Sequence, residues 1–249
     1  MQVESAPTSG FLSHAQEVQI AGGNFVNARE VHLTVNQAPL DDNVNAVEEE
    51  ILSDSEIYSN KLLCAKRGLP IYDPAPIRNL PSEYRRLGVM IGDVGRVTPD
   101  GVFDYFFNVY RPADDAVNAH GVHPDFRPLP IYDYRGVLDQ QQQPGSYVST
   151  PKVFRVPGRG SQEDFPGSRF IFSCNIRAGA ILALPYGSQC EKLQNIKDLR
   201  QYAADNADSW YRYVNGSSRG RELQNGHLLL ITGWEKTNSW GMATFRIPV

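Results

Sequence analysis

Three arginines in the second half of the chain, Arg212, Arg219 and Arg221, are the residues that suggest chemistry most directly. Arg219 and Arg221 stand in a loop-like run that is rich in glycine and serine. Guanidinium groups and free backbone N–H groups both bind phosphate or carboxylate groups, so this run predicts an anion site. Because the arginines lie near the end of a predicted helix, the alternative is that they only complement the negative end of its dipole.

Cys190 is the candidate for a reactive thiol. Ser188 and Glu191 have the spacing of a capping box, so we expect a helix to begin here with Cys190 in its first turn. Backbone N–H groups and the helix dipole would favour the thiolate at that position. A catalytic cysteine also needs a histidine and an orienting group. The alternative is a small side chain that is partly buried at a helix start.

The run from Gly216 to Gly220 matches the G-x-S-x-G pattern of a nucleophile elbow. Such an elbow needs a strand before its serine and a helix after it, because that strained turn exposes the hydroxyl. Here a helical pattern comes first and polar residues follow. The sequence therefore favours a helix that ends at Gly216, after which the chain continues as an exposed loop.

Two groups of residues have the chemistry of metal ligands without the usual spacing. His120 and His123 would place two imidazoles near one ion, but no further pair of cysteines or histidines accompanies them. Asp93, Asp100 and Asp104 would supply oxygens, but Asp100 is explained by a turn and the pattern of a calcium loop is missing. We therefore expect no metal ion, and no cofactor either, since the sequence has no phosphate-binding or dinucleotide-binding glycine motif.

The three tryptophans divide by position. Trp210 falls on the apolar stripe of the predicted helix and Trp240 in a predicted strand, so both are expected in the core. Trp234 falls in a predicted turn, which makes it the candidate for an exposed aromatic contact.

In the first half of the chain, the elements that must position these residues are mostly predicted strands. Residues 18–35 alternate apolar and polar side chains and form a strand-like arm, and the acidic stretch after them is either a weak helix or a connector. Four prolines make 69–81 an extended linker. Residues 89–97 and 102–110 flank Thr-Pro-Asp-Gly and predict a β-hairpin. The proline-containing stretch 112–151 predicts a long irregular excursion.

In the second half, residues 169–176 and 179–185 predict a strand pair. Apolar residues at spacings of three and four indicate one main amphipathic helix at about 189–215. Two strands, 227–232 and 240–247, close the chain around a polar turn. The fold class expected is α+β, predominantly antiparallel β with sandwich-like sheets. An N-terminal arm with its acidic connector would take residues 1–68, and the main β-rich domain residues 69–249.

Two blocks of sequence carry a family resemblance. The first includes Gly92-Asp93-Val94-Gly95, Thr98-Pro99-Asp100-Gly101-Val102-Phe103-Asp104 and Phe107-Asn108. The second includes Trp210-Tyr211-Arg212-Tyr213-Val214-Asn215, Ile231-Thr232-Gly233, Lys236 and Ser239-Trp240-Gly241. Both resemble blocks of an uncharacterised family of proteins of mushroom-forming (basidiomycete) fungi. The likeness spans about residues 70–245, where the predicted strands and helix lie. It implies no activity and no catalytic residue.

Composition limits the classes of function. The formal net charge of −4 argues against a protein that coats nucleic acid, which is usually basic. The first ten residues lack the charged and apolar regions of a secretory signal, and three widely spaced cysteines form no disulfide framework. The longest apolar runs are far shorter than the ~20 residues of a membrane-spanning helix. We therefore expect a soluble, cytoplasmic protein.

The function predicted from these observations is a non-enzymatic protein-interaction or scaffold module. It would bind a protein partner, or a second copy of itself, through the arm at 18–35, whose few charges suit pairing with a strand edge. The first alternative is a β-rich pore-forming protein that attacks membranes, and this is the only hypothesis that involves a membrane. The second alternative is an enzyme that depends on Cys190.

Overall fold

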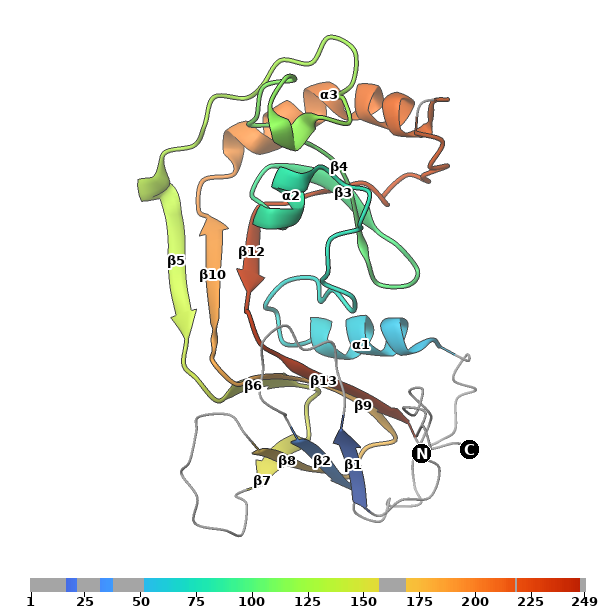
Figure 1. Ribbon diagram of the computed structural model, residues 1–249, viewed down its shortest axis with the longest axis vertical. Helices are drawn as coiled ribbons and strands as arrows, with labels where there is room; N and C mark the ends of the chain where they lie inside the picture. Colours follow the sequence, from blue (N-terminus) through green and yellow to red (C-terminus); the bar gives the residue numbers. More distant parts are fainter. Residues whose placement is uncertain (1–16, 22–31, 38–51, 157–168, 218, 247–249) are drawn as a thin grey trace, which may run out of the picture. The chain divides into compact units, whose positions relative to one another are not determined.

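The chain folds into two compact units (Figure 1). The structure is a computed structural model that describes residues 17–21, 32–37, 52–156, 169–217 and 219–246, with the backbone alone for 17–21, 32–37 and 169. Unit 1 consists of Met1–Pro70, Gln143–Gly187 and Thr237–Val249, and unit 2 consists of Ile71–Gln142 and Ser188–Lys236.

The division between the units differs from the one expected at residues 68 and 69. Its first boundary, at Pro70, lies close to that position. However, unit 1 also contains Gln143–Gly187 and Thr237–Val249, which the sequence analysis assigned to a single main domain. These later segments hold strands that pair with one another and with the N-terminal strands. Pairing over such distances leaves no mark in local composition.

The described residues of unit 1 form two β-sheets with the strand orders β1-β2-β8-β7 and β13-β9-β6. Neighbouring strands are antiparallel, except that β2 runs parallel to β8. The arm predicted at 18–35 thus supplies two strands that join a sheet of the same chain, while residues 22–31 between them lie outside the described residues. The bounds are β1 Glu17–Ala21, β2 His32–Gln37, β6 Ser146–Ser149, β7 Val153–Val156, β8 Arg169–Cys174, β9 Ala178–Leu184 and β13 Gly241–Arg246.

The core of unit 1 forms between alternating apolar side chains of β8 and β9. Phe170 and Phe172 of β8 pack with Ile181 and Ala183 of β9, and all four are buried. Because successive side chains of a strand point to opposite faces, each sheet turns one apolar face to the other, as in a sandwich. The predicted pairing of these two strands with each other is wrong. The chain bends between them and passes from one sheet to the next.

The last part of the stretch between the arm and residue 64 forms a helix, α1 (Asp54–Leu63). Its start has a capping box: Ser53 Oγ accepts from the backbone N–H of Glu56 at 3.3 Å, and the Glu56 carboxylate accepts from the backbone N–H of Ser53 at 2.7 Å. The helix buries Ile57, Tyr58 and Leu62 and contacts β9 and β13. Of the two interpretations of this stretch, the helix is confirmed for Asp54–Leu63, while the acidic residues at 41–50 lie outside the described residues.

Unit 2 contains the predicted hairpin, formed by β3 (Asp93–Val97) and β4 (Phe103–Asn108). Its turn is closed by hydrogen bonds from Thr98 N to Val102 O at 2.9 Å and from Gly101 N to Thr98 O at 2.8 Å. Every residue of β4 is buried, because the strand lies between β3 and the two core clusters of the unit. A short strand, β11 (Leu229–Leu230), pairs with the other edge of β3.

A β-bulge adjusts the register of the hairpin. The register changes between Val94 and Gly95, which leaves Phe106 as an extra residue in β4. Because of this bulge, the neighbours Phe106 and Phe107 both enter the same core cluster. A Cβ atom at Gly95 would lie 2.7 Å from the carbonyl oxygen of Asp104, so the close approach of the two strands requires glycine there.

The second sheet of unit 2 overturns part of the helix prediction. Its strands are β12 (Gly233–Lys236), β10 (Ser188–Leu193) and β5 (Val137–Gln142), in the order β12-β10-β5. Residues 189–193, expected to begin the helix, therefore form a strand, and the capping box of Ser188 and Glu191 does not exist. The Ser188 hydroxyl instead donates to the Glu235 carboxylate on β12. Residues 137–142 and 146–149, expected to be irregular, are strands for the same reason, since distant partners pair with them.

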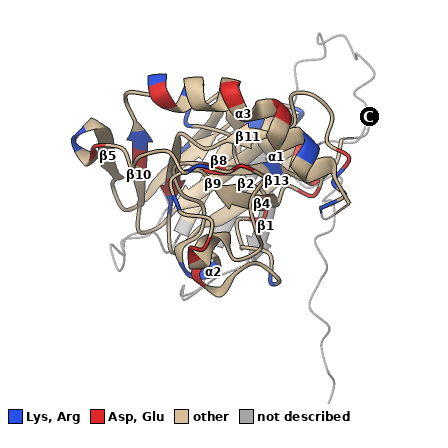
Figure 2. Ribbon diagram, turned by 90° about the horizontal axis from the view of Figure 1, so that it is seen from above, with Lys and Arg blue, Asp and Glu red and all other residues tan. Residues whose placement is uncertain are grey.

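The main helix is shorter than predicted and runs from Lys197 to Asn215 as α3, with Gly216 as its C-cap, as the sequence indicated. Leu199, Trp210 and Val214 are buried against the Phe106–Phe107 side of the hairpin. Seen from above, the exposed side of α3 carries charged residues of both signs (Figure 2). The helix is thus amphipathic and covers one core cluster of unit 2. The remaining elements in the described part of the chain are α2 (Ser82–Leu87) and the 3-10 turns η1 (Ala116–Asn118) and η2 (Tyr134–Gly136).

A fully buried carboxyl group, that of Asp93, lies at the start of the hairpin. One of its oxygens accepts from Met90 N at 2.6 Å and from the Tyr84 hydroxyl at 3.2 Å. The other accepts from Nδ2 of Asn108, directly opposite on β4, at 2.7 Å. Three donors thus satisfy a group that is shielded from water.

Asn118 extends this network to the loop after β4. Its Oδ1 accepts from Asn108 N at 2.8 Å and from the Tyr105 hydroxyl at 3.0 Å. Its Nδ2 donates to the carbonyl oxygens of Asn108, Arg111 and Pro112. The buried amide therefore ties the irregular segment after β4 to the strand itself.

Burial raises the pKa of Asp93 to about 7, and the effect exceeds the opposite influence of its three hydrogen bonds and of Lys236. Burial also lowers the pKa of Lys236, whose ammonium donates to the carbonyl oxygen of Leu87 at 2.8 Å. The two groups therefore place titratable charge inside unit 2.

These observations confirm an α+β fold that is mainly antiparallel β. Among the described residues, no helix is both long and apolar enough to cross a membrane.

We expect Asp93→Asn to lower the free energy of unfolding of unit 2 by about 1–3 kcal/mol. An asparagine keeps an acceptor for Met90 N and Tyr84, but its own amide nitrogen would face the Nδ2 donor of Asn108. Urea denaturation followed by tryptophan fluorescence would measure the loss. The background variant Trp240→Phe removes the tryptophan of unit 1.

The same variant tests the pH dependence. Because the folded pKa of Asp93 is raised to about 7 from 3.8, the folded state holds the extra proton between about pH 4 and pH 7. Its contribution to stability is therefore complete below pH 4 and decreases as the pH rises through 7. We expect Asp93→Asn to lack this decrease and the exposed-turn control Asp100→Asn to retain it. An identical slope in wild type and Asp93→Asn would contradict the assignment.

Candidate functional site

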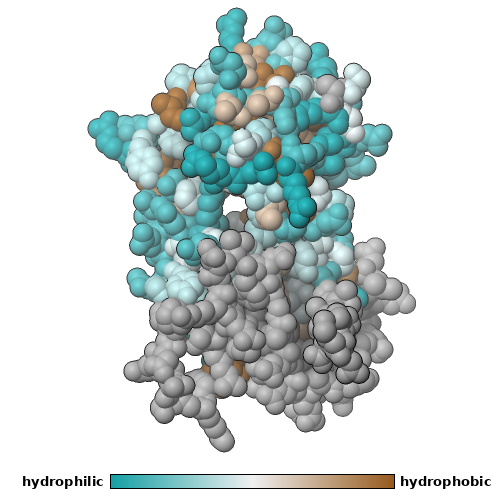
Figure 3. Space-filling model, viewed as in Figure 1, coloured by the Kyte–Doolittle hydropathy of each residue, from teal (hydrophilic) through white to brown (hydrophobic). Residues whose placement is uncertain are grey.

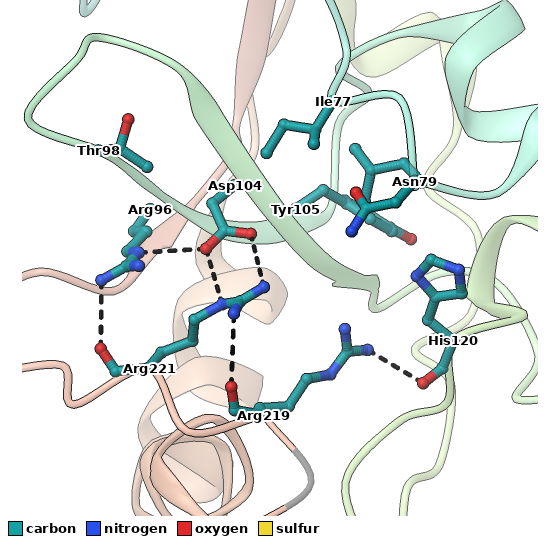
Figure 4. A pocket seen from close by; sticks show the side chains of 10 residues that line it. Ile77, Asn79, Arg96, Thr98, Asp104, Tyr105, His120, Arg219 and Arg221 are labelled. Carbon is teal, nitrogen blue, oxygen red and sulfur yellow. Dashed lines mark hydrogen bonds and ion pairs between the residues drawn. The ribbon is translucent and has the colours of Figure 1, made fainter.

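A pocket of about 260 Å³ opens on unit 2 beside the hairpin turn (Figure 4). Its walls come from four segments of the chain: the proline-rich run before α2, the hairpin, the loop after η1 and the loop after α3. The lining residues are Ile77, Asn79, Leu80, Arg96, Thr98, Asp104, Tyr105, His120, Arg219 and Arg221. Arginine is the most frequent residue in this lining.

An ion-pair cluster forms one side of the pocket. The Asp104 carboxylate lies 3.2 Å from Nε of Arg96 and 2.9 Å from Nε of Arg221. The second Asp104 oxygen accepts from Nη2 of Arg221 at 3.3 Å, so Arg221 holds the carboxylate with two nitrogens. Only 6% of the Asp104 side chain is exposed. One nearly buried carboxylate thus joins two guanidinium groups from distant parts of the sequence.

Backbone carbonyls fix the third guanidinium. Nη2 of Arg219 donates to the carbonyl oxygens of Phe106, His120 and Gly121 at 3.1–3.3 Å, and Nε donates to the Tyr213 hydroxyl at 3.1 Å. Within the described residues no hydrogen bond uses Nη1, which points into the pocket in Figure 4. Arg219 is therefore rigidly held and still has a free donor.

The proline-rich segment 69–81 forms no helix and no regular strand, but it is neither fully extended nor a free linker, because it turns where Leu80 N donates to Ile77 O at 3.0 Å. Asp73 N donates to Gly101 O at 3.1 Å, which holds the segment against the hairpin turn. Leu80 is buried in the cluster that also contains Tyr105, and Ile77 packs against this cluster. The segment thereby becomes a wall of the pocket.

The charge of the lining is strongly positive. Three guanidiniums against one carboxylate leave an excess of two positive charges, while the chain as a whole has a net charge of −4. Arginine remains protonated at any pH that a folded protein experiences. An anion is therefore the ligand that this pocket favours.

The structure brings together two of the three arginines that the sequence singled out. Arg219 and Arg221 line the pocket, whereas Arg212 is exposed on α3 and donates to the carbonyl oxygen of Asp208 in its own helix. Arg212 does not belong to the site because it lies in the last turn of α3, whereas Arg219 and Arg221 stand in the loop after Gly216.

Two further candidates fall outside the pocket. Cys190 lies in the middle of β10, half-buried between Gln140 and Glu235 of the neighbouring strands, so the helix-start argument for its thiolate is wrong. Trp234 is partly buried, packs against the cluster beneath α3 and lies under the Lys236 ammonium at 4.3 Å. It is not an exposed contact because it belongs to a strand and not to a turn.

The two histidines have different surroundings. His120 is exposed and contributes to the pocket. His123 is buried, with Nδ1 at 2.8 Å from both the Ser209 hydroxyl and the carbonyl oxygen of Pro124, and burial lowers its pKa. Ser218, the serine of the G-x-S-x-G pattern, lies outside the described residues. Among those described, no cluster of histidine, cysteine and carboxylate side chains has the arrangement of a metal site.

Sequence reasoning missed Arg96 and considered Asp104 only as a possible cation ligand, although a signal for their pairing was present. A hairpin closed by the turn at 98–101 sets the two residues directly opposite each other. An arginine and an aspartate at such positions form a cross-strand ion pair. Nothing in the sequence shows that Arg221 joins this pair from 117 residues away.

Comparison with protein-family models, with curated proteins and with solved structures gives no match. The resemblance to a fungal family therefore stays a prediction. What the pocket does must be inferred from its own residues.

We expect Asp104→Asn to destabilise unit 2 by about 1.5–3 kcal/mol, because two guanidiniums lose their shared charged acceptor. Urea denaturation in the Trp240→Phe background measures this. The matched control is Asp100→Asn on the exposed turn of the same hairpin, which should leave the midpoint unchanged. Equal midpoints for the two variants would show that the ion-pair cluster does not hold the pocket together.

Proposed function

We propose that this chain is a non-enzymatic binding module, which holds an anionic group of a protein partner in the pocket of unit 2. The observation that supports this proposal is a set of arginines fixed in place with an excess of positive charge. A cytoplasmic location belongs to the proposal, and the three free thiols are consistent with a reducing compartment.

The chemistry of the lining favours binding over proton transfer. The arginines keep their protons, and the Asp104 carboxylate is committed to two of them. Burial raises the pKa of Tyr105 far above neutrality, and its hydroxyl is bonded to Asn118. The arginines of the pocket therefore attract an anion, and neither they nor Asp104 and Tyr105 exchange protons with it.

The arginines are also preorganised. Three carbonyl oxygens and a tyrosine hydroxyl hold Arg219, while Arg96 and Arg221 share Asp104 and Arg96 also donates to the carbonyl oxygen of Arg221 at 3.2 Å. Side chains that are already ordered lose little conformational entropy when a ligand binds. On the face of unit 2 seen in Figure 3, hydrophilic residues predominate, which suits recognition through charge.

An anion panel tests the proposal. Acetate, succinate, sulfate and inorganic phosphate would be titrated at constant ionic strength, with calorimetry and thermal unfolding as readouts. We expect at least one anion to bind wild type and Asn79→Asp to weaken it by roughly tenfold or more, because the new carboxylate repels the ligand.

Arg212→Ala is the matched control, since it removes a positive charge outside the pocket. It should bind like wild type. If Arg212→Ala weakens binding as much as Asn79→Asp, the effect comes from net charge and the pocket is not the site. If wild type binds none of the anions, the proposal fails.

A second candidate function is self-association through the N-terminal arm. The observation that favours it is that, among the strands that the structure describes, β1 forms the edge of a four-stranded sheet, and an edge strand offers unpaired backbone groups to another strand. The inner strand β2 is already paired with β8. Contact with a second copy is therefore proposed for β1 alone.

Removing residues 1–21 tests this second candidate, because it deletes β1 and leaves β2 on β8. We expect sedimentation equilibrium to show a larger species for the full chain and a monomer for the shortened one. The same mass distribution for both chains would refute a role of the arm in association.

A further inference from the structure

We infer that the anion held by the arginine pocket is a phosphate monoester, an inference that rests on the function proposed above. Charge is the first argument. The lining has an excess of two positive charges. A phosphate monoester carries about −1.5 to −2 at neutral pH, whereas a side-chain carboxylate carries −1. The dianion is therefore the group whose charge matches the pocket.

The arrangement of free donors is the second argument. A carboxylate binds best to two adjacent nitrogens of one guanidinium. In this pocket Arg221 already gives such a pair to Asp104, and Arg96 uses Nε and Nη1 while Arg219 uses Nε and Nη2. Within the described residues, the terminal nitrogens that make no hydrogen bond are Nη2 of Arg96 and Nη1 of Arg219, since Nη1 of Arg221 donates to the carbonyl oxygen of Arg219 at 3.5 Å.

Single donors from separate directions suit a tetrahedral group. Asn79 and His120 come from two other segments, are exposed, and point toward the same space in Figure 4. Phosphate has three oxygens that spread in different directions and accept from several side chains at once. A planar carboxylate would leave part of this set unused.

The size and apolar side of the pocket indicate an ester. The volume is about 260 Å³, several times the roughly 30 Å³ share of one water molecule in the liquid, and Ile77 and Leu80 form part of the wall. Inorganic phosphate would leave this apolar part empty. A phosphate attached to a short carbon chain would place its oxygens on the arginines and the chain against these residues.

The test compares four probes on the full chain at constant ionic strength. These are N-acetyl-phosphoserine amide, N-acetyl-serine amide, inorganic phosphate and succinate, with affinity measured by calorimetry. We expect the phosphoserine amide to bind roughly tenfold more tightly than inorganic phosphate and succinate, and the unphosphorylated amide not to bind.

Two variants connect the affinity to the pocket without disturbing its fixed arginines. Asn79→Ala and His120→Ala each remove an exposed side chain, so we expect each to weaken the phosphoserine amide several-fold while the melting temperature stays constant. Arg212→Ala should leave the affinity unchanged. Unaltered affinity in both pocket variants would overturn the assignment.

The remaining outcomes separate this inference from the proposed function. If succinate binds more tightly than the phosphoserine amide, the phosphate ester is refuted, but the proposal of an anion-binding module stands. Equal binding of inorganic phosphate and the ester would refute the ester. If no probe binds, both fail. A hexose monophosphate is an additional arm, and its tighter binding would support the ester but replace the protein partner by a small molecule.

Discussion

The burial of the Asp93 carboxyl is the constraint on which unit 2 depends. A carboxyl group that is shielded from water needs hydrogen-bond donors, and Met90, Tyr84 and Asn108 supply them. These donors come from the turn before β3, from α2 and from the opposite strand. The network therefore joins α2 to the hairpin. If one of these elements moved away, the buried carboxyl would lose a donor, and this would cost free energy of folding.

The same network supports the floor of the arginine pocket. Tyr105 stacks on Tyr84 with ring centroids 3.8 Å apart and donates to Asn118, which binds the backbone of Asn108. Asp104, the neighbour of Tyr105 on β4, holds the arginines. Adjacent residues of one strand thus serve the buried network and the charged cluster. Strand β4 therefore accounts both for the rigid packing below the pocket and for the ordered arginines within it.

Local sequence patterns predicted the elements whose geometry is fixed by neighbouring residues. The turn at 98–101 predicted the hairpin, and Gly216 marked the end of the main helix. The same kind of reasoning failed for Ser188–Leu193, where the capping pattern was present but pairing with β5 and β12 made a strand. For the pocket, the run around Arg219 and Arg221 was found, while the contribution of segment 69–81 was not. Neither its prolines nor its apolar residues indicate which surface it lies on.

The sequence by itself determined that this is an α+β protein with a TPDG hairpin, an amphipathic helix and a basic loop after it. Backbone geometry and apolar periodicity decide these features over a few residues. Only the tertiary structure decided which arginines act together. Arg96 and Arg221 meet on Asp104 because the chain returns to the hairpin after more than a hundred residues, whereas Arg212 stays on the solvent side of α3. Charges far apart in sequence share a site through packing, and packing is a property of the whole fold.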